Sequence, residues 1–257
     1  MISKAQTIIS KWRAGVYDQT ENADKLISMV LTLIGCAPKS IFEPGCGTGK
    51  VLSHLAREGH AACGMDVDDH MLFHAKEKAA FSPMRLINAD ILIAPWPKDF
   101  DCILLISDLM HSLITDWEYK QAQKQLIMKS AASIQKGGLL LLDFNCPIAL
   151  GLLTENEEKC ILSGTDKSGT KGCMYIKHTE SEEKTRLLKS RIRYELTTDD
   201  GEKMVMQQNF VRHILTLEET TSWLYRAGFS IEALYGSCDF HPFDEKNRRC
   251  VIAARKE

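Results

Sequence analysis

Three glycines, Gly45, Gly47 and Gly49, stand at alternate positions in the stretch SIFEPGCGTGKV, directly behind a short apolar run. Because glycine permits positive φ and leaves main-chain N–H groups open to a ligand, such a loop can hold a nucleotide or a nucleoside. A triphosphate loop ends in G-K-[ST], whereas Val51 has no hydroxyl to reach magnesium. A dinucleotide loop needs G-x-G-x-x-G, and Lys50 stands at its third glycine. The spacing therefore disfavours both kinds of phosphate-binding loop.

Carboxylates flank the glycine loop. Glu43 precedes it, and Asp66, followed by Val67, ends the next apolar run, where a carboxylate can accept both hydroxyls of a ribose. In NADI, after a third apolar run, Asp90 can accept from an adenine amino group while Ile91 packs against the ring. This negative surround suits a nucleoside that carries an ammonium and a sulfonium, and it is wrong for a pyrophosphate. These residues predict S-adenosylmethionine as the cofactor.

Candidate catalytic residues follow a fourth apolar run, in ISDLMHSL. Open α/β sheets bind ligands at the carboxyl ends of their strands, so His111 is the best candidate for a general base there. Asp108 is a weaker rival at the same edge. Methyl transfer from a sulfonium depends mainly on alignment, and a hydroxyl acceptor needs a base more than an amine does. A purely structural, hydrogen-bonded histidine remains the open alternative.

Composition narrows the class of protein. The chain has 257 residues, 26% charged residues and a formal net charge of −2, which gives no reason to expect nucleic acid as a partner. Nine cysteines without a C-x-x-C pair disfavour a disulfide framework and a structural metal site. The first residues form an amphipathic pattern instead of a signal peptide, and no run approaches the roughly 20 apolar residues of a membrane span. We expect a cytoplasmic protein, and a homodimer stays open.

Alternating elements must position these residues. Five apolar runs between residues 40 and 145 predict strands: SIFEPG, HAACGMDV, MRLINAD, DCILLIS and GGLLLLDFN. Helical patterns separate them: KVLSHLAREG, DDHMLFHAKEKAA and DWEYKQAQKQLIMKSAASIQKGG, the last closing on a glycine pair. Strand–helix alternation implies right-handed crossovers and a parallel sheet, so the fold class is doubly wound α/β.

The pattern changes after this core. A β-hairpin turning at Asp200-Gly201 is predicted, with GCMYIKHTE as a third strand of the same antiparallel sheet. A helix follows, with Thr216 and Glu219 as its capping box, and then two strands, SIEALYGSC and CVIAARK. We therefore divide the chain into an N-terminal helical lid (1–38), a cofactor-binding core (39–146), an inserted β subdomain that caps the substrate (147–213) and the rest of the core (214–257).

The motifs EPGCGTG, GMDVDDHML, NADI and FDCILLIS resemble, in order and spacing, those of class I S-adenosylmethionine-dependent methyltransferases. The segment LTLEETTSWLYRAGFSIEALYG is similar to the penultimate helix and strand of that family. The resemblance implies a Rossmann-like sheet of seven strands, the last antiparallel. It places the following residues at the cofactor: Glu43, Gly45, Cys46, Gly47, Gly49, Asp66, Val67, Asp90 and Ile91. It also places Ser107 where the methionine end passes, and Tyr17 in a lid over that end.

Within the family, the inserted strands and the helix carrying KWRAGVYD resemble small-molecule enzymes, such as glycine or sarcosine N-methyltransferases and amino-sugar N-methyltransferases. This layout implies a small-molecule acceptor. Residues that could contact it are Tyr175, Arg193, Arg212 and His241.

Other functions remain open from the sequence. An RNA or protein methyltransferase fits the charged hairpin, and a non-catalytic nucleoside-binding module fits the absence of an evident base. A dinucleotide oxidoreductase is disfavoured by Lys50. Enzymes that methylate exocyclic amines of DNA bases carry Asn/Asp-Pro-Pro-aromatic after the fourth strand, and the stretch SDLM replaces it here.

Overall fold

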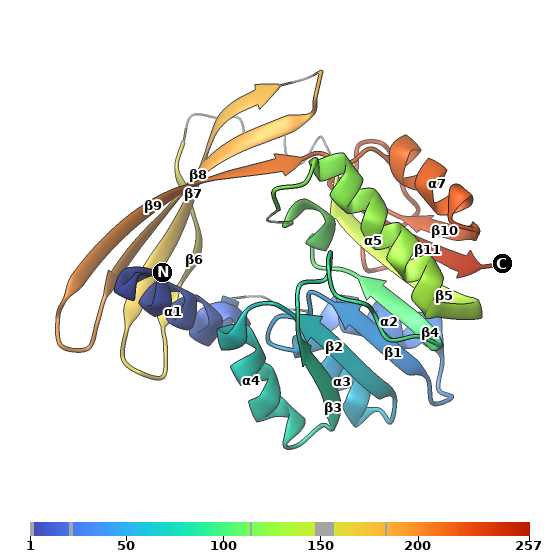
Figure 1. Cartoon of the computed structure of the whole chain (residues 1–257), viewed down its shortest axis with the longest axis horizontal. Helices are drawn as coiled ribbons and strands as arrows, with labels where there is room; N and C mark the ends of the chain where they lie inside the picture. Colours follow the sequence, from blue (N-terminus) through green and yellow to red (C-terminus); the bar gives the residue numbers. More distant parts are fainter. Residues whose placement is uncertain (1–2, 21–22, 114, 147–156, 183) are drawn as a thin grey trace.

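The structure is a computed structural model that describes residues 3–20, 23–113, 115–146, 157–182 and 184–257. Its larger sheet has seven strands in the order β10-β11-β5-β4-β1-β2-β3 (Figure 1). These strands are β1 (Ser40–Pro44), β2 (Ala61–Asp66), β3 (Met84–Asn88), β4 (Phe100–Leu105), β5 (Ile134–Asn145), β10 (Phe229–Tyr235) and β11 (Arg249–Lys256). β1 to β5 pair in parallel, while β11 is antiparallel to β5 and β10. The predicted Rossmann-like sheet with an antiparallel last strand is confirmed.

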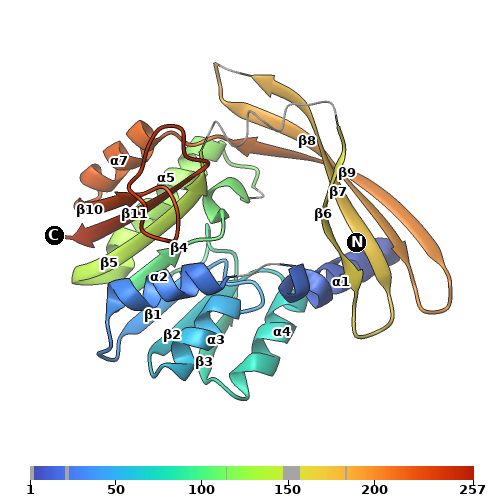
Figure 2. The same ribbon diagram turned by 180° about the vertical axis from the view of Figure 1, so that it is seen from behind.

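Helices cover both faces of this sheet (Figures 1 and 2). The helices that cover it are α2 (Asp24–Ile34), α3 (Lys50–Arg57), α4 (Asp69–Ala79), α5 (Tyr119–Ser133) and α7 (Leu217–Arg226). Helix α1 (Lys4–Thr20) lies beside the second sheet, and a 3-10 turn, η1 (Leu109–His111), follows β4. Side chains of β4 alternate between two cores: Cys102 and Leu104 pack with α2, α3 and α4, and Ile103 and Leu105 pack with α5 and α7. The doubly wound prediction is confirmed. Along the described ranges, no helix combines the length and apolar character needed to cross a membrane.

The end of α5 differs from the prediction. The helix was expected to continue to the glycine pair, but it ends at Ser133, and β5 begins at Ile134. Ile134 pairs with Phe100 of β4 and is buried there, so strand pairing overrides the helical pattern. The glycines lie inside the strand instead. A Cβ on Gly138 would stand 2.6 Å from the Ile134 side chain, which explains why glycine is required.

The second sheet is antiparallel, with the order β6-β7-β8-β9. Its strands are β6 (Lys159–Thr165), β7 (Lys171–Glu182), β8 (Leu187–Thr197) and β9 (Lys203–His213). The predicted hairpin and third strand are confirmed, and Gly201 in the turn has φ of +87°. Strand β6 was missed because most of its side chains are exposed, which leaves no clear alternation in the sequence. The predicted boundary at residue 147 lies outside the described residues.

Helix α1 packs against the second sheet and against α4. Trp12 is fully buried, and its Nε1 donates a hydrogen bond to the Gly164 carbonyl at 3.1 Å. The helix and the sheet share an apolar cluster, built mainly from Ile9, Trp12, Val16, Leu162, Ile176, Ile192, Tyr194 and Leu196. The N-terminal helix and the inserted sheet thus form one layer beside the parallel sheet (Figures 1 and 2).

Candidate functional site

The glycine loop joins the end of β1 to the start of α3, and its glycines Gly45, Gly47 and Gly49 have φ of +70°, +53° and +66°. The Gly45 N–H donates to the Met65 carbonyl at 2.7 Å, which ties the loop to β2. A Cβ on Gly45 would stand 2.5 Å from a methyl of Leu109, whereas one on Gly47 would meet nothing within 4 Å. Gly45 is therefore needed for packing, and Gly47 borders open space that a ligand can fill.

Asp66 lies directly beside this loop, at the end of β2. Its Oδ2 accepts from the Gly47 N–H at 2.8 Å, and its Oδ1 accepts from the Asp68 N–H at 2.9 Å. Burial raises the pKa of Asp66, and these hydrogen bonds offset only part of the rise. Each carboxylate oxygen keeps a further lone pair for a hydroxyl. The structure thus brings Asp66 to the glycine loop, and its contact with a ribose stays a prediction.

Glu43, at the end of β1, is buried, and its Oε2 has no hydrogen-bond partner among the described residues. Burial, and then the nearby charge of Asp66, raise the pKa of Glu43 well above its ordinary value. A buried polar atom without a partner is rare and costs stability, so this carboxyl fits a ligand with a positively charged donor. An orphaned acid beside an open glycine loop fits the ammonium and sulfonium of S-adenosylmethionine.

Cys46 contributes main chain to the loop, while its side chain belongs to the core. The thiol packs over β2, where a Cβ on Gly64 would stand 2.6 Å from its sulfur. Burial, with the charges of Glu43 and Asp66, raises the pKa of the Cys46 thiol well above its ordinary value. The thiol therefore stays protonated and unreactive.

Val67, predicted to bind the cofactor, directly follows β2, and Asp90 and Ile91, predicted to hold the adenine, lie just after β3. Val67 is 69% exposed, as expected for an apolar side chain that a ligand would cover. The Oδ1 of Asp90 accepts from the Leu92 N–H at 2.8 Å and so caps a turn. Ile91 is half-buried, and its carbonyl accepts from Lys129 Nζ at 2.6 Å. Asp90 thus has a structural task, and the adenine contact of both residues stays a prediction.

Two successive residues after β4 adopt the left-handed region: Ser107 at φ +58° and Asp108 at φ +59°. Such backbone strain in residues other than glycine is uncommon and gathers at functional sites. The Ser107 N–H donates to Asp143 at 3.2 Å, and Asp108 Oδ1 accepts from the Asn145 N–H at 3.0 Å. The next residue, Leu109, packs on Gly45, so the strained segment after β4 lies next to the glycine loop.

His111 is buried, and both of its ring nitrogens bind protein groups. Nδ1 lies 2.8 Å from Asp108 Oδ1, and Nε2 accepts from the Leu215 N–H at 3.1 Å, so the proton of the neutral ring is on Nδ1. Burial opposes ionisation of Asp108, but its hydrogen bonds with His111 and with the Asn145 N–H, together with the charge of Arg212, hold its pKa below the ordinary value. This geometry favours the structural alternative for His111, because a base would first have to break the bond to Leu215. Its catalytic role, like that of Asp108, stays a prediction.

Helix α1 contacts the glycine loop through Asp18, a residue that the sequence did not indicate. Asp18 Oδ1 accepts from Thr48 Oγ1 at 2.7 Å, and Oδ2 lies 2.6 Å from Lys78 Nζ. Lys78 also donates to the Thr48 carbonyl at 2.8 Å. We call these three residues the Asp18 latch. No signal could have revealed the latch, because a charged helix residue is usually solvated and its partners are distant in sequence.

Tyr17, predicted as part of a lid, lies beside the latch. It is half-buried, with its ring centroid 6.0 Å from Lys50 Nζ at the start of α3. A second ion pair, between Arg13 and Asp68 at 2.7 Å, joins α1 to the cap of α4. The structure therefore places the N-terminal helix against the cofactor loop, and closure of Tyr17 over the methionine end stays a prediction.

The four residues proposed to contact substrate separate in the structure. Arg212, on the inner face of the inserted sheet, has Nη1 3.8 Å from Asp108 Oδ2. Arg193 lies on the outer face, where it pairs with Glu158 and stacks on Tyr175, 4.3 Å from the ring centroid. The expectation that Arg193 and Tyr175 face the substrate is therefore wrong, because strand alternation turns them away. His241 lies in an exposed loop after β10.

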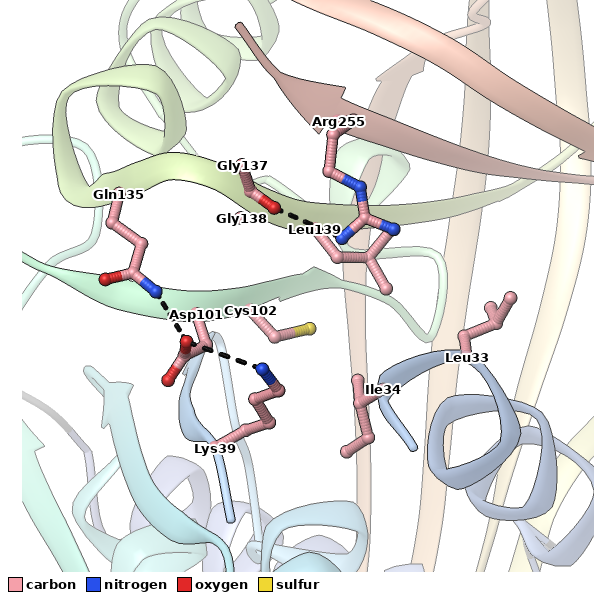
Figure 3. Close-up of a pocket in the computed structure, with 10 residues that line it drawn as sticks. All are labelled: Leu33, Ile34, Lys39, Asp101, Cys102, Gln135, Gly137, Gly138, Leu139 and Arg255. Carbon is pink, nitrogen blue, oxygen red and sulfur yellow. Dashed lines mark hydrogen bonds and ion pairs between the residues drawn. The ribbon is translucent and has the colours of Figure 1, made fainter. Parts of the chain in front are cut away.

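A cavity of about 160 Å³ lies at the opposite edge of the sheet, at the amino ends of β4 and β5 (Figure 3). Its polar wall groups bind one another: Gln135 and Lys39 contact Asp101, and Arg255 donates to the Gly137 carbonyl at 3.2 Å. Burial raises the pKa of Cys102 in the wall to about 12, which makes the thiol inert. This edge also has a residue in the left-handed region, Asp99 at φ +68° directly before β4, but none of the described residues that line the cavity has a buried side-chain nitrogen or oxygen without a hydrogen-bond partner. Over the described parts of the chain, no group of three or more acidic, histidine or cysteine side chains could hold a metal ion.

A sequence-family model described as a methyltransferase domain matches residues 41–129, which span β1 to most of α5. A curated relative from Geobacillus sp. (strain WCH70), named as a methyltransferase, is 22% identical over 228 residues and covers 85% of each chain. Among solved structures, an S-adenosylmethionine-dependent methyltransferase from Clostridium acetobutylicum ATCC 824 matches with a TM-score of 0.75 and 14% identity, over 95% of this chain and 96% of that one.

An amino pentose methyltransferase from Micromonospora echinaspora, solved with S-adenosylmethionine bound, also matches. Its TM-score is 0.69 at 16% identity, over 95% of this chain and 96% of that one. At such low identity these structures establish a shared fold, and the match includes the inserted sheet as well as the core.

Proposed function

The chain has a methyltransferase domain with the class I fold that uses S-adenosylmethionine, and from this premise we propose that it methylates a nitrogen or oxygen of a small-molecule acceptor. The observation that carries the proposal is the layer of α1 and the inserted sheet beside the carboxyl ends of the parallel strands. The apolar side chains of this layer are buried between α1 and the sheet, and Arg212 is a charged group of the inner face that reaches Asp108. We call this layer, α1 with strands β6 to β9, the ceiling of the site. A layer in this position would enclose a small acceptor next to the cofactor.

The residues of the chain bind and align the reactants. S-adenosylmethionine supplies an electrophilic methyl group whose transfer needs the nucleophile, carbon and sulfur in line, with the reacting atoms roughly 3 Å apart. In this proposal Asp66 holds the ribose, Glu43 pairs with positive charge of the ligand, and the open side of Gly47 admits it. The acceptor lies against the strained residues Ser107 and Asp108, on the side of the site formed by the parallel sheet.

The amino pentose enzyme supports a small acceptor, since its fold matches over nearly the whole chain. The charged hairpin that favoured RNA or protein as an acceptor gives less support. Two of its outer-face cations are paired with carboxylates of the same sheet or the residue before it: Lys189 with Glu180 at 3.0 Å, and Arg193 with Glu158. A surface whose charges neutralise one another offers little attraction to a polyanion.

Two measurements test the proposal. Calorimetry should detect binding of S-adenosylmethionine and of its demethylated product, and no binding of either would overturn the cofactor assignment. Labelled methyl groups should then be followed from the cofactor into cell extract separated by size. We expect label in the small-molecule fraction; label confined to RNA or protein would overturn the acceptor class, and no incorporation would favour a non-catalytic module.

A further inference from the structure

A second buried histidine, His178 of β7, lies on the inner face of the inserted sheet. It pairs in register with Ser190 of β8, and both side chains are buried. The Nδ1 of His178 lies 2.6 Å from Ser190 Oγ, which fixes the plane of the ring. The other ring nitrogen, Nε2, is buried without a hydrogen-bond partner among the residues that the structure describes.

This unpaired nitrogen belongs to a small group of similar atoms. Buried side-chain nitrogens and oxygens are nearly always hydrogen-bonded, so each exception asks for an explanation. In the described ranges the exceptions include Glu43 Oε2 at the cofactor loop and Arg212 Nε on the same inner face as His178. Arg212 also reaches Asp108 at the strained end of β4, and His178 lies on the same inner face, in the row of paired residues next to that of Arg212.

The charges around His178 keep its ring neutral. Burial is the largest cause that lowers the pKa of His178, followed by the positive charges of Arg212 on β9 and Lys159 on β6. A neutral imidazole has one nitrogen that donates and one that accepts. If Nδ1 donates to Ser190, Nε2 presents a lone pair at neutral pH. His111 has no such lone pair, because the Leu215 N–H occupies it.

We propose that His178 is the general base of the reaction, with Nε2 taking the proton of the methyl acceptor and Ser190 holding the ring. This inference rests on the proposed methyl transfer. The N–H or O–H bond of the acceptor breaks, and its proton goes to Nε2. The electron pair left on nitrogen or oxygen forms the bond to the methyl carbon, and the carbon–sulfur pair returns to sulfur, which becomes a neutral thioether. Arg212 disfavours a lasting imidazolium, so His178 is expected to release the proton again quickly.

The tautomer of His178 can be measured without turnover. We expect ¹⁵N NMR of the ligand-free protein at neutral pH to show Nδ1 protonated and Nε2 bare, with the signals assigned by their loss in His178→Asn. The ring should also titrate below an ordinary histidine. A proton on Nε2, with the Ser190 hydroxyl donating to Nδ1, would overturn the proposal.

Kinetics give the second test, with the unlabelled small-molecule fraction of cell extract as acceptor and methyl-labelled S-adenosylmethionine as donor. His178→Asn should lower kcat by about 10²–10⁴-fold, and the acid limb of the wild-type pH profile should vanish. Calorimetric affinity for S-adenosylmethionine should not change, which also reports that the variant is folded. Ser190→Ala, which keeps the imidazole, should show a smaller loss. His74→Asn, on α4 where the ring contacts Glu77, is the matched control and should behave as wild type.

The outcomes separate the two proposals. Wild-type protein that does not bind the cofactor contradicts the methyltransferase assignment itself. Normal cofactor binding together with full turnover in His178→Asn contradicts only the role of His178. If His178→Asn does not fold, unchanged kcat and an unchanged acid limb in Ser190→Ala contradict the inference in the same way.

Discussion

Two carboxylates at opposite edges of the seven-stranded sheet, Asp101 and Glu43, have opposite surroundings. At the amino edge, Asp101 accepts from the Ser40 N–H at 2.8 Å and from its hydroxyl at 2.9 Å, and Gln135 and Lys39 contact the other oxygen (Figure 3). Burial opposes ionisation of Asp101, but these partners hold its pKa below the ordinary value. At the carboxyl edge, Glu43 has an oxygen without a partner in the described chain, and its pKa is raised by burial and by Asp66.

The difference separates groups that hold the fold together from groups that await a ligand. A carboxylate with a full set of donors stabilises the folded state by itself. A buried acid that lacks a donor destabilises it until something else supplies one. Ser107 and Asp108, two successive residues in the left-handed region, lie at the same edge as Glu43, where the cofactor is proposed to bind.

Among the variants that test this difference, we expect Gly47→Val to show the largest loss of cofactor affinity. The added side chain would point into space that is open in the structure, where the cofactor is proposed to lie. We expect affinity for S-adenosylmethionine to fall by at least about 100-fold, which corresponds to about 2.7 kcal/mol, in a protein that still folds. Isothermal calorimetry and circular dichroism measure the two properties.

Gly59→Val is the matched control for this variant. Gly59 also has positive φ, at +91°, and its Cβ position is also open, but it lies beyond the far end of α3. The backbone strain of the two variants is therefore similar. An equal loss of affinity in both would show that strain, and not occupation of the site, explains the effect of Gly47→Val.

A somewhat smaller loss is expected from Asp66→Ala. The substitution removes a carboxylate that supports the Gly47 N–H and is proposed to accept from ribose hydroxyls. Affinity for the cofactor should weaken by about 1.5–3 kcal/mol, the scale of hydrogen bonds to a charged group. Calorimetry measures it, with the exposed neighbour Asp69→Ala as control. Equal affinities of the Asp66 variant and the wild type would place the ribose elsewhere.

Glu43→Gln should move stability and affinity in opposite directions. The amide removes an acid that is costly to ionise in the fold, so the ligand-free protein should gain about 1 kcal/mol of unfolding free energy while binding the cofactor more weakly. The folded-state pKa of Glu43 is raised, so the wild type loses stability as pH rises through the ordinary glutamate pKa. The advantage of the glutamine variant should therefore grow from about pH 4 to about pH 7. Denaturant unfolding at the two pH values measures it.

Asp101→Asn, at the amino edge, is the matched opposite case. The pKa of Asp101 is lowered in the folded state, so its contribution is present above the ordinary aspartate pKa and is lost as pH falls through the folded value. The variant should lose about 1 kcal/mol of stability at neutral pH and keep full affinity for the cofactor. If both variants changed stability in the same direction, the contrast between the edges would be wrong.

Much of the carboxyl edge could be predicted from the sequence because its signals are local. Gly45, Gly47 and Gly49 lie in one short stretch, and Asp66 ends an apolar run, so spacing alone places them at the carboxyl ends of neighbouring strands. The seven strands were recognisable for the same reason. The end of α5 was not, because only the pairing of Ile134 with Phe100 decides it.

Three strands of the inserted sheet were predicted, but the contacts of its inner face could not be, because they join residues far apart in sequence. His178, Ser190 and Arg212 come together only through the register of three strands. Arg193 was misplaced and His178 was missed for this reason. His111 was recognisable as a residue of the edge, but its bond to Leu215 was not.

The smallest expected effect belongs to the Asp18 latch, where the ceiling reaches the predictable edge. Asp18→Ala removes the acceptor of Thr48 Oγ1 and the partner of Lys78, at a site about a third exposed. Because the pair is partly solvated, we expect only about 0.5–1 kcal/mol of lost cofactor affinity, together with faster cofactor dissociation in stopped flow and faster hydrogen exchange in α1. Lys4→Ala, which breaks the exposed pair with Glu202 at the other end of the same helix, should change neither rate. Identical behaviour of the two variants would mean that the Asp18 latch does not stabilise the cofactor loop. Helix α1 would then contribute only its packing, and cofactor binding would not depend on it.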